Sequence, residues 1–545
     1  MIASYLSKNF LYLFVSCLFS IWITRNVFFW VNLWQIKEYR LDRLKAHLLN
    51  TNQGKRLIFG VENILKNVVF LLFFISIFYD KLSSYYYLFI LFVFIESFIK
   101  VIYEVLDRRI KFPVLTIKAV VAVFITLLTV YILYAFPLLD KFFWLLFIDR
   151  LVVLIIALEI MLLFLPSDFY KDWIIYKAVK KRNNFKNLLV IGVTGSYGKG
   201  STKEFIASIL SEKFSLVKTF GNNNTSIGVA KTINKLLKPG KKIFVAEMGA
   251  YKKGEIKEIC SIAKPRIGVL TAVDDQHIAL FGDIKNTMET KYELIESLPN
   301  NGFSVFSANN QNSLTLANRT RRKKVIYFAD YNNTKRKYDI NAINIKINKF
   351  SISFDIDIKG EIIHNFKVKL LGKYNTENLL PGIYLAKFLG MSWNQIREAV
   401  KKIYPIKKTM EPFMSTSEAV FVDDTYNSGY ASVNSALEYM EIYKGKKFLV
   451  LSPLIELGKN ASFDYIELGK KIGVICDYLI LMNNDFIKDI KNGITSSGSG
   501  CEIIQESPKR IAEFIKVTCI KSDVVVFEGR EACAVLKFLE YEKIN

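Results

Sequence analysis

The sequence predicts an α-helical membrane region followed by an α/β region, and three observations lead to this prediction. Long apolar runs fill the first third of the chain. From residue 187 onward, short apolar strands alternate with helical stretches, which is typical of a parallel α/β domain. A glycine-rich turn between Val190 and Thr202 joins one of these strands to a helix.

The composition agrees with a membrane protein. The 545 residues carry a formal net charge of +24 and are 51% hydrophobic. We interpret this combination as apolar spans with basic cytoplasmic flanks, and we expect no nucleic-acid partner. The six cysteines contain no CxxC pair, which argues against a zinc site or a disulfide framework and fits a reducing compartment.

We expect residues 1–166 to form a membrane region with about five transmembrane helices, because each apolar run approaches the roughly 20 residues that cross a bilayer. Five such runs in succession disfavour the alternative of buried core helices. The runs cover about 9–34, 57–79, 84–105, 113–138 and 142–166.

The charges of the connecting loops predict the orientation of the spans. Basic residues gather after the first, third and fifth runs, whereas the alternate loops hold only Lys81 or Lys141. Because cytoplasmic loops carry the excess of lysine and arginine, the N-terminus should lie outside. Everything after about residue 167 should lie in the cytoplasm, beginning with a solvated basic linker at 167–186. We therefore expect a multi-pass protein of the cytoplasmic membrane.

Ionisable side chains within or near the ends of the runs allow two interpretations. Such residues are costly in lipid and often functional. Alternatively, those near span ends reach the interface, and Asp149 and Arg150 pair with neighbouring helices. The residues concerned are Arg25, Glu62, Lys66, Glu96, Lys118, Asp149, Arg150 and Glu159.

The turn between Val190 and Thr202 has the composition of a phosphate-binding loop. Glycines let backbone N–H groups approach an anion, the following helix adds partial positive charge, and Lys199 can reach terminal phosphates. The spacing is tighter than the usual Walker pattern, so the turn alone is equally compatible with an ordinary strand-to-helix connection. The candidate binding residues are Gly195, Ser196, Gly198, Lys199, Gly200 and Ser201.

Polar residues follow the next predicted strands, where ligands of parallel sheets gather. The strand candidates are 187–193, 242–248, 266–273 and 303–307. Glu247 leaves the second strand and is well placed to hold Mg²⁺. His277 follows the third, although a single histidine is more often structural than a ligand. Lys291 lies on the next helix, where composition alone favours a surface lysine paired with Glu289 or Glu293.

Taken together, eight ordered motifs over about 187–545 resemble those of the Mur ligase family. The closest resemblance within it is to the D-alanyl-D-alanine-adding (MurF-type) ligases. The motifs are the TGSxGK loop at 194–199, the GNxN…IGV loop at 221–229, the AExG strand end at 246–249, His277 with Phe281 and Gly282, Lys291 in a KxEL context, Gly372 to Asn378, Asp423 to Asn427, and Ile455 to Gly458.

The resemblance implies a P-loop-like central ATPase domain with a mixed sheet at 187–408 and a C-terminal Rossmann-like domain at 409–545. It implies ATP and Mg²⁺ as cofactors. The glycine loop would hold the β- and γ-phosphates, and Lys291 would be carbamylated. The implied catalytic residues are Lys199, Lys291 and His277; the nucleotide-region residues are Asn375, Asn378, Asp424, Tyr426 and Asn427; the metal residues are Ser201, Glu247, His277 and Lys291.

The function implied by the resemblance is ATP-dependent amide ligation at the cytoplasmic membrane face, through an acyl phosphate. Addition of D-Ala-D-Ala to a UDP-MurNAc peptide in peptidoglycan synthesis is the leading expectation. The expected partners are ATP, a carboxylate-bearing envelope precursor, an amino acid or dipeptide, and membrane lipid. Two alternatives stay open: a ligase for a poly-γ-glutamate-type polymer or lipid-linked glycan, and a membrane scaffold that has lost catalysis.

The sequence also departs from the family pattern. Gly200 replaces a hydroxyl residue, in a Lys-Gly-Ser run that is also similar to folylpolyglutamate synthases. Ala272 stands where asparagine is common, Tyr374 replaces a histidine, and an arginine expected near Thr409 is absent. The membrane region stands in place of the family's usual UDP-sugar-binding domain. The departures at 200, 272 and 409 motivate the scaffold alternative, whereas retention of Lys199, Glu247, His277 and Lys291 argues against it.

Overall fold

The computed structural model describes residues 2–50, 52–78, 80–107, 110–221, 223–274, 283–334, 336–426, 429–454, 461–483 and 486–543. The chain divides into two compact units, Met1–Lys171 and Asp172–Asn545. The first unit is helical and the second alternates strands with helices, so the expected order of a helical region and an α/β region is confirmed.

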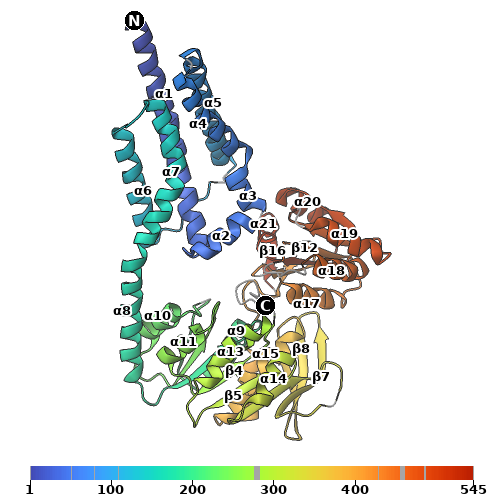
Figure 1. Ribbon diagram of the computed structural model, residues 1–545. Helices are drawn as coiled ribbons and strands as arrows, with labels where there is room; N and C mark the ends of the chain where they lie inside the picture. The colour runs from blue at the N-terminus through green and yellow to red at the C-terminus, as the bar shows by residue number, and fades with distance from the viewer. Residues whose placement is uncertain are drawn as a thin grey trace. The chain divides into compact units, whose positions relative to one another are not determined.

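The first unit contains a helix for each of the five apolar runs (Figure 1). Pro113 and Pro137 flank one of them, as expected because proline cannot continue a helix interior. The helices are α1 (Ile2–Ile36), α2 (Leu41–Asn50), α3 (Asn52–Phe59), α4 (Val61–Phe78), α5 (Asp80–Leu106), α6 (Ile117–Ala135) and α7 (Lys141–Leu162).

Three helical segments within the described residues are long and apolar enough to cross a membrane: Asn9–Ile36, Gly54–Ile75 and Ile117–Ala135. Five were expected. The helix α7 carries Asp149, Arg150 and Glu159, and this charge separates it from an ordinary lipid-facing span. Length and composition therefore support three of the expected spans, and the crossing itself stays a prediction.

A buried ion pair joins α4 to α7. Lys66 Nζ lies 3.2 Å from Asp149 Oδ2, and both side chains are only 2% exposed. Trp22 on α1 donates its indole N–H to Asp149 Oδ1 at 2.7 Å. Arg150 donates to Asn63 Oδ1 on α4 at 3.1 Å. These contacts agree with the interpretation in which Asp149 and Arg150 pair with neighbouring helices.

The segment expected to be a solvated linker is instead a helix, α8 (Phe164–Asn183). Ile174 and Ala178 are buried in an apolar cluster of the second unit. The Arg182 guanidinium is also buried and donates to the carbonyl oxygens of Ala263 at 2.9 Å and Phe185 at 2.8 Å. The expectation was wrong for this face because apolar residues four positions apart share one side of a helix and pack.

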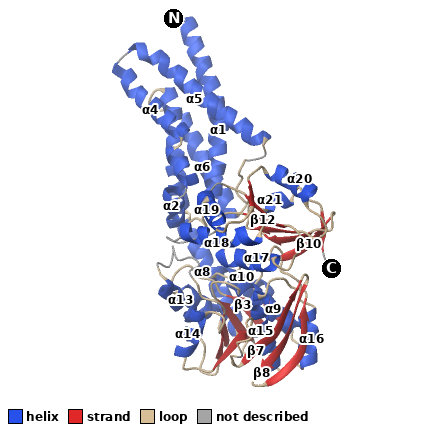
Figure 2. Ribbon diagram, turned by 90° about the vertical axis from the view of Figure 1, so that its right-hand side faces the viewer, coloured by secondary structure: helices blue, strands red, loops and turns tan. Residues whose placement is uncertain are grey.

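A nine-stranded mixed sheet forms the first half of the second unit, in the order β2-β3-β1-β4-β5-β6-β7-β8-β9. Its strands pair in parallel up to β7, and β8 pairs antiparallel with both β7 and β9. Figure 2 shows β3, β7 and β8 of this sheet. The strands are β1 (Leu189–Thr194), β2 (Leu216–Lys218), β3 (Ile243–Glu247), β4 (Ile267–Leu270), β5 (Phe303–Ser307), β6 (Lys324–Ala329), β7 (Ile340–Asn348), β8 (Ser351–Ile358) and β9 (Glu361–Val368). All four strands expected from the sequence are confirmed, and the expected mixed sheet is observed.

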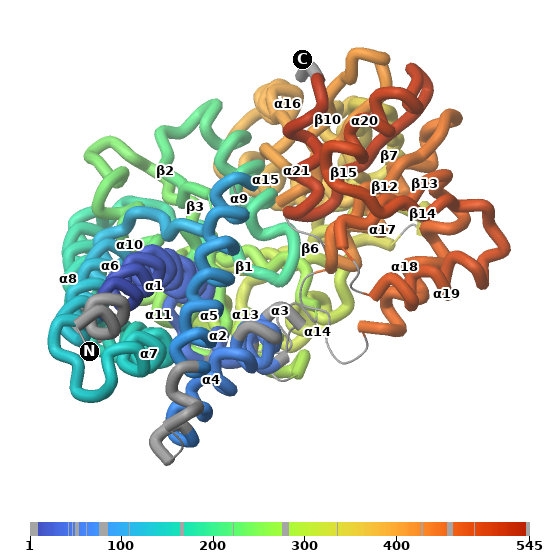
Figure 3. Tube along the Cα trace, turned by 90° about the horizontal axis from the view of Figure 1, so that it is seen from above, coloured from blue at the N-terminus to red at the C-terminus, as the bar shows by residue number. Residues whose placement is uncertain are grey.

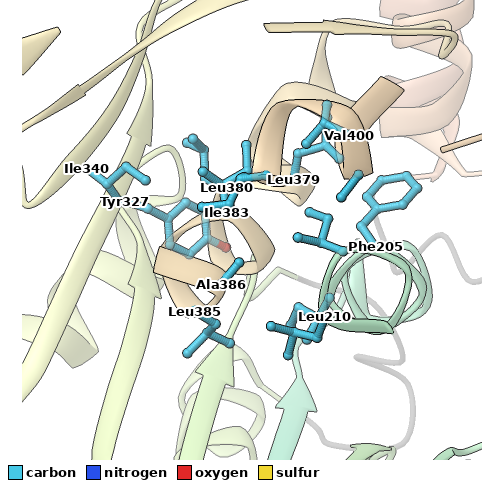
Figure 4. Packing of buried hydrophobic residues seen from close by; sticks show 14 of the residues in the cluster. Phe205, Leu210, Tyr327, Ile340, Leu379, Leu380, Ile383, Leu385, Ala386 and Val400 are labelled. Carbon is cyan, nitrogen blue, oxygen red and sulfur yellow. The ribbon is translucent and has the colours of Figure 1, made fainter. Parts of the chain in front are cut away.

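Helices cover both faces of this sheet. One face packs on α9 (Lys199–Ser211), α15 (Tyr374–Phe388) and α16 (Trp393–Lys401), and Figure 4 shows Phe205, Leu380 and Val400 in this core. The other face packs on α8 and on α10 (Ser226–Leu236), α11 (Glu255–Ala263), α13 (Ile284–Glu296) and α14 (Gln311–Arg319). The β1 strand is thus buried on both faces, which explains its unbroken apolar sequence.

A second sheet, of seven strands, has the order β14-β13-β12-β15-β11-β10-β16 (Figure 3). Five of its strands are parallel, and α17 to α19 cover one face while α20 and α21 cover the other, which is the doubly wound arrangement expected. The strands are β10 (Glu411–Ser415), β11 (Val420–Asp424), β12 (Lys447–Leu451), β13 (Tyr478–Leu481), β14 (Glu502–Ile504), β15 (Val524–Glu528) and β16 (Tyr541–Lys543); the helices are α17 (Tyr430–Met440), α18 (Ala461–Ile475), α19 (Ile487–Ser496), α20 (Pro508–Thr518) and α21 (Cys533–Leu536).

Candidate active site

The glycine loop lies between β1 and α9, as the sequence predicts. Gly195 has φ +152°, and a Cβ there would lie 2.0 Å from Thr271 Oγ1, beyond the end of β4. That hydroxyl donates to the Tyr197 carbonyl oxygen at 2.6 Å. Ser196 is fastened to the same strand end, because its backbone N–H donates to Ala272 O at 2.6 Å. A glycine is therefore required at 195 for the loop to lie this close to β4.

Lys199 is the first residue of α9, and its ammonium lies over the loop. Its Nζ donates to the carbonyl oxygen of Ser196 at 2.8 Å. Gly198, with φ +78°, caps the helix without a side chain. An exposed helix N-terminus with a lysine beside it attracts phosphate by charge and by N–H donors. The arrangement of strand, loop, lysine and helix predicted from the sequence is present.

Of the two predicted asparagines on α15, Asn378 contacts this loop and Asn375 supports Asn378. Asn378 Oδ1 accepts from Thr202 Oγ1 at 3.3 Å, and a Cβ on Gly198 would lie 2.5 Å from it. Asn378 Nδ2 donates to Asn375 Oδ1 at 3.4 Å, and Asn375 Nδ2 donates to the Leu371 carbonyl oxygen at 2.7 Å. The chain of amides therefore fixes the position of α15 against the phosphate loop.

Glu247 ends β3 beside the loop, and both of its carboxylate oxygens have partners. Asn224 Nδ2 donates to Oε1 at 3.0 Å, and the Lys203 ammonium lies 3.2 Å from Oε2. Lys203 is itself buried and lies 3.1 Å from Glu204 Oε1. Sequence reasoning assigned no role to Lys203, because a lysine one turn after Lys199 gives no local indication of burial.

Positions 200 and 201 face different surroundings. A Cβ added at Gly200 would lie 3.7 Å from Glu247 Oε2, so a hydroxyl side chain there would be directed toward that carboxylate. Ser201 instead lines a small cavity with Phe205, Asn375 and Met410. The geometry thus places position 200, rather than the adjacent serine, beside Glu247, and the role of Ser201 as a metal ligand stays a prediction.

Lys291 is a buried residue of α13, not a surface lysine. Its Nζ is 3.5 Å from the Ala250 carbonyl oxygen, just beyond β3. Burial, together with the positive charge of Lys199, lowers the pKa of Lys291 to about 7. A lysine with this pKa is half neutral at pH 7, and a neutral amine is the form that adds CO₂. This environment is consistent with the expected carbamate.

Glu289 and Glu293, the two expected local partners of Lys291, each contact other groups. Glu289 forms an ion pair with Arg319, at 2.6 Å. Glu293 accepts from the backbone N–H groups of Gly254 at 2.6 Å and Lys257 at 3.0 Å, at the start of α11. The interpretation of Lys291 as a surface residue is therefore wrong, whereas the Glu293 carboxylate still favours its charged form.

The second sheet contributes a carboxyl pair near the phosphate loop. Asp424 and Glu528 are cross-strand partners at the ends of β11 and β15, and both are buried. Ser432 donates to Glu528 at 2.6 Å. Burial raises the pKa of Asp424 to about 7, and burial with the adjacent Asp424 raises the pKa of Glu528. Both shifts favour the protonated, neutral form of each carboxyl group.

The segment after β11 reaches the loop itself, since a Cβ on Gly429 would lie 4.0 Å from the Tyr197 ring. Tyr426 lies at the surface, and its backbone N–H donates to the Lys408 carbonyl oxygen at 3.0 Å. Glu528 was missed in the sequence because its partner is distant along the chain and becomes adjacent only by strand pairing.

Two expected site residues, His277 and Asn427, lie outside the described residues, as do Ile455 to Gly458 of the last motif. Within the part of the chain that the structure describes, no group of three His, Cys, Asp or Glu side chains is arranged to hold a metal ion. Glu247 is the one expected carboxylate ligand among these residues, so the expected Mg²⁺ ligand set stays a prediction.

Comparison with known proteins identifies relatives of this arrangement. The family model of the Mur ligase middle domain matches residues 193–386. The UDP-N-acetylmuramoyl-tripeptide–D-alanyl-D-alanine ligase of Synechocystis sp. is 30% identical over 348 residues, which cover 62% of this chain and 71% of that protein. The ligase of the same name from Escherichia coli is 26% identical over 281 residues, 52% of this chain and 61% of its own length.

Solved structures agree with this result. The MurF ligase from Thermotoga maritima in complex with ADP superimposes with a TM-score of 0.60 at 26% identity, covering 68% of this chain and 83% of its own. MurF from Acinetobacter baumannii has a TM-score of 0.60 at 21% identity, covering 68% of this chain and 80% of its own, and supports the fold alone.

Proposed function

The chain belongs to the Mur ligase family, whose relatives here are ATP-dependent ligases, and from this premise we propose that it adds D-Ala-D-Ala to the peptide of a UDP-MurNAc precursor. The observation that carries the proposal is the Lys199 loop beside Glu247 and the buried Lys291. An ADP-bound relative with the same fold supports ATP as the phosphoryl donor.

In the proposed reaction, an oxygen of the acceptor carboxylate attacks the γ-phosphorus of ATP, giving an acyl phosphate and ADP. The neutral amine of D-Ala-D-Ala then attacks the acyl carbon, forms the amide bond and releases inorganic phosphate. Lys199 and the N-terminus of α9 would neutralise charge on the transferring phosphoryl group, which is typically the largest contribution in such reactions. The attacking nitrogen must lose a proton as the amide forms, and we propose the buried Asp424–Glu528 pair as the group that takes it up.

Glu247 fits a role in holding Mg²⁺, because its carboxylate lies at the edge of the phosphate loop. We propose that His277 and a carbamylated Lys291 complete the ligand set. The metal would supply charge stabilisation to the phosphoryl oxygens when bound. Lys203 keeps the Glu247 carboxylate in place through its ammonium group.

We further propose that the N-terminal helices anchor the ligase in the cytoplasmic membrane, with the N-terminus outside and the second unit in the cytoplasm. Three apolar helices and the asymmetry of basic loop residues support this placement. A reporter fused after residue 82 or 140 should be external, and one fused after residue 110 or 175 should be cytoplasmic. The opposite pattern would reject this orientation.

A ligase acting on a different acceptor, such as a poly-γ-glutamate-type polymer or a lipid-linked glycan, remains the second candidate. Its supporting observation is the apolar helical region, which would bring the enzyme close to lipid-bound acceptors if these helices cross a membrane. A scaffold without catalysis is disfavoured by the buried lysines, because burying Lys203 and Lys291 is costly without a function.

The detergent-solubilised full-length protein should be assayed for ADP release against a panel of UDP-MurNAc peptides, lipid-linked equivalents and polyglutamate, each with and without D-Ala-D-Ala. The proposal expects ADP release that requires both a UDP-MurNAc peptide and D-Ala-D-Ala. Release with the lipid-linked acceptor alone would favour the second candidate. If none of the acceptors in the panel supports ATP turnover, amide ligation to these substrates is rejected.

A further inference from the structure

The helix α8 has two faces, one buried against the second unit and one exposed. The docked face contains Ile174 and Ala178, which are buried in the core of the second unit, and Arg182, whose guanidinium is bound to backbone carbonyl groups. Asn234 on α10 also donates to the Ile174 carbonyl oxygen at 3.0 Å. This face holds α8 firmly against the ligase domain.

The opposite face presents a stripe of large aromatic side chains. At 3.6 residues per turn, positions 169, 173, 176 and 180 fall on one side of the helix, roughly opposite 174 and 178. The exposed fractions are 77% for Phe169, 49% for Trp173 and 64% for Tyr176. Tyr170 lies at the edge of this stripe, toward Ile174, and is 59% exposed. Four aromatic residues exposed together on a well-formed helix are unusual for a surface that faces water.

The same face is basic. Lys177 and Lys180 are exposed among the aromatic residues, and the Lys177 ammonium lies 3.5 Å from the centre of the Trp173 ring. Lysine side chains can lie along apolar surface and extend their ammonium groups to phosphate. The whole of α8 carries a net positive charge, because its five basic residues outnumber its two aspartates, Asp168 and Asp172.

We propose that this aromatic–basic face of α8, formed by Phe169, Tyr170, Trp173, Tyr176, Lys177 and Lys180, lies in the headgroup layer of an anionic membrane. Tryptophan and tyrosine concentrate at the membrane–water interface, where the ring is buried and the polar group stays wet. Lysines complement the negative surface of the cytoplasmic leaflet. The helix α8 begins two residues after α7, whose sequence was expected to span, so an interfacial position is within reach.

An interfacial α8 would bind the ligase domain to the lipid surface through Ile174, Ala178 and Arg182, rather than tether it by a flexible segment. This inference does not depend on the identity of the acceptor. It would fail if the stripe were covered by protein, either by the helices of the first unit or by another chain, and each of these occupants gives a different result in the test below.

The test uses the full-length protein in lipid nanodiscs, with the photo-crosslinking amino acid p-benzoylphenylalanine placed at Phe169 or Tyr176. The matched control carries the same group at Val517, which is 87% exposed and lies on α20, a helix that covers the second sheet. After illumination, mass spectrometry identifies the adduct. The proposal expects phospholipid adducts at 169 and 176 at a yield at least ten-fold above that at 517.

Charge reversal provides a second readout that does not depend on tolerance of the probe at one position. In nanodiscs containing phosphatidylglycerol, Lys177→Glu with Lys180→Glu should lower the lipid-adduct yield at Phe169 roughly five-fold or more, since each basic residue contributes measurably to binding an anionic surface. Lys509→Glu with Lys516→Glu, on exposed positions of α20, makes the same charge change and should leave the yield unchanged.

Three outcomes would overturn the proposal. Lipid adducts at 169 and 176 that do not exceed those at 517 would show that the face is not in contact with lipid. A crosslinked peptide from α1 to α7 would show that the first unit covers it, and a crosslink that joins two protein chains would show that another chain does. Equal effects of the two charge reversals would show that Lys177 and Lys180 have no specific part in lipid contact.

Discussion

Replacing Lys291 by methionine should stabilise the protein in a pH-dependent manner when CO₂ is absent. The pKa of Lys291 in the folded protein, about 7, lies below the value of 10.5 for an unperturbed lysine. Between these values the unfolded chain binds more protons than the folded one, so the stability of the wild type rises as the pH increases from about 7 to about 10. Below pH 7 the wild type carries the full penalty of burying an ammonium group.

The size of that penalty follows from the two pKa values. The difference, 10.5 minus about 7, is ~3.5, and at ~1.4 kcal/mol for each pH unit it corresponds to about 5 kcal/mol. Lys291→Met removes the titrating group and fills the same buried space with an apolar chain. The variant should therefore unfold at a higher temperature than the wild type at pH 6.5, and the difference should shrink as the pH approaches 9.

The assay is thermal unfolding of the full-length protein in CO₂-free buffer across this pH range, with Lys231→Met, an exposed lysine of α10, as the matched control. Adding bicarbonate at pH 8 should raise the unfolding temperature of the wild type and of the Lys231 variant, but not that of Lys291→Met. In NMR spectra, ¹³C-bicarbonate should give a carbamate signal only in the proteins that contain Lys291. Parallel pH profiles for the wild type and Lys291→Met would refute a lowered pKa, and a bicarbonate effect that survives in Lys291→Met would refute carbamylation there.

Three further predictions concern the phosphate loop and the helical unit. Lys199→Ala should abolish ATP turnover while the unfolding temperature changes little, because the proposed role of its ammonium is to neutralise the transferring phosphoryl group. Wild-type turnover in this variant would remove the nucleotide assignment. Gly198→Ala should weaken ATP binding at least ten-fold and destabilise the protein by about 1–3 kcal/mol, since φ is positive at this position and the new methyl group would meet Asn378. Calorimetric titration with ADP measures the affinity, and thermal unfolding measures the stability. Unchanged affinity would count against the tight loop. Lys66→Met should lower stability in detergent by about 1–3 kcal/mol, because the buried Asp149 would keep Arg150 at 3.3 Å but lose its Lys66 partner. Asp149→Asn added to it should restore part of the loss, and equal stability of both variants would argue against the pair.

Local sequence patterns predicted the elements whose formation depends on neighbouring residues. The β1 strand, the glycine loop and the start of α9 follow from an apolar run, two glycines and a helix-forming stretch within about 20 residues. Asn375 and Asn378 were placed near the nucleotide only through resemblance to a family. The contact of Asn378 with Gly198 is a property of the folded chain.

The remaining features depend on residues that are distant along the chain. Glu528 faces Asp424 because β15 pairs with β11, and no local pattern specifies which strands become neighbours. Lys203 and Lys291 look like surface lysines in sequence, because charged residues on a helix usually are exposed. The docking of α8 was missed for the related reason that its lysines and arginines dominated the composition, while Ile174 and Ala178 determine its packing.

The most direct test of the account is an isotope-transfer experiment. The acceptor carboxylate is labelled with ¹⁸O, and the inorganic phosphate released with ATP, Mg²⁺ and D-Ala-D-Ala is analysed by mass spectrometry. Attack of the carboxylate on the γ-phosphorus leaves one carboxylate oxygen in the phosphate after the amine displaces it, so each phosphate formed should carry one ¹⁸O and appear in a one-to-one ratio with amide product. Unlabelled phosphate, or phosphate released without amide, would contradict the assignment of this chain as an acyl-phosphate-forming ligase.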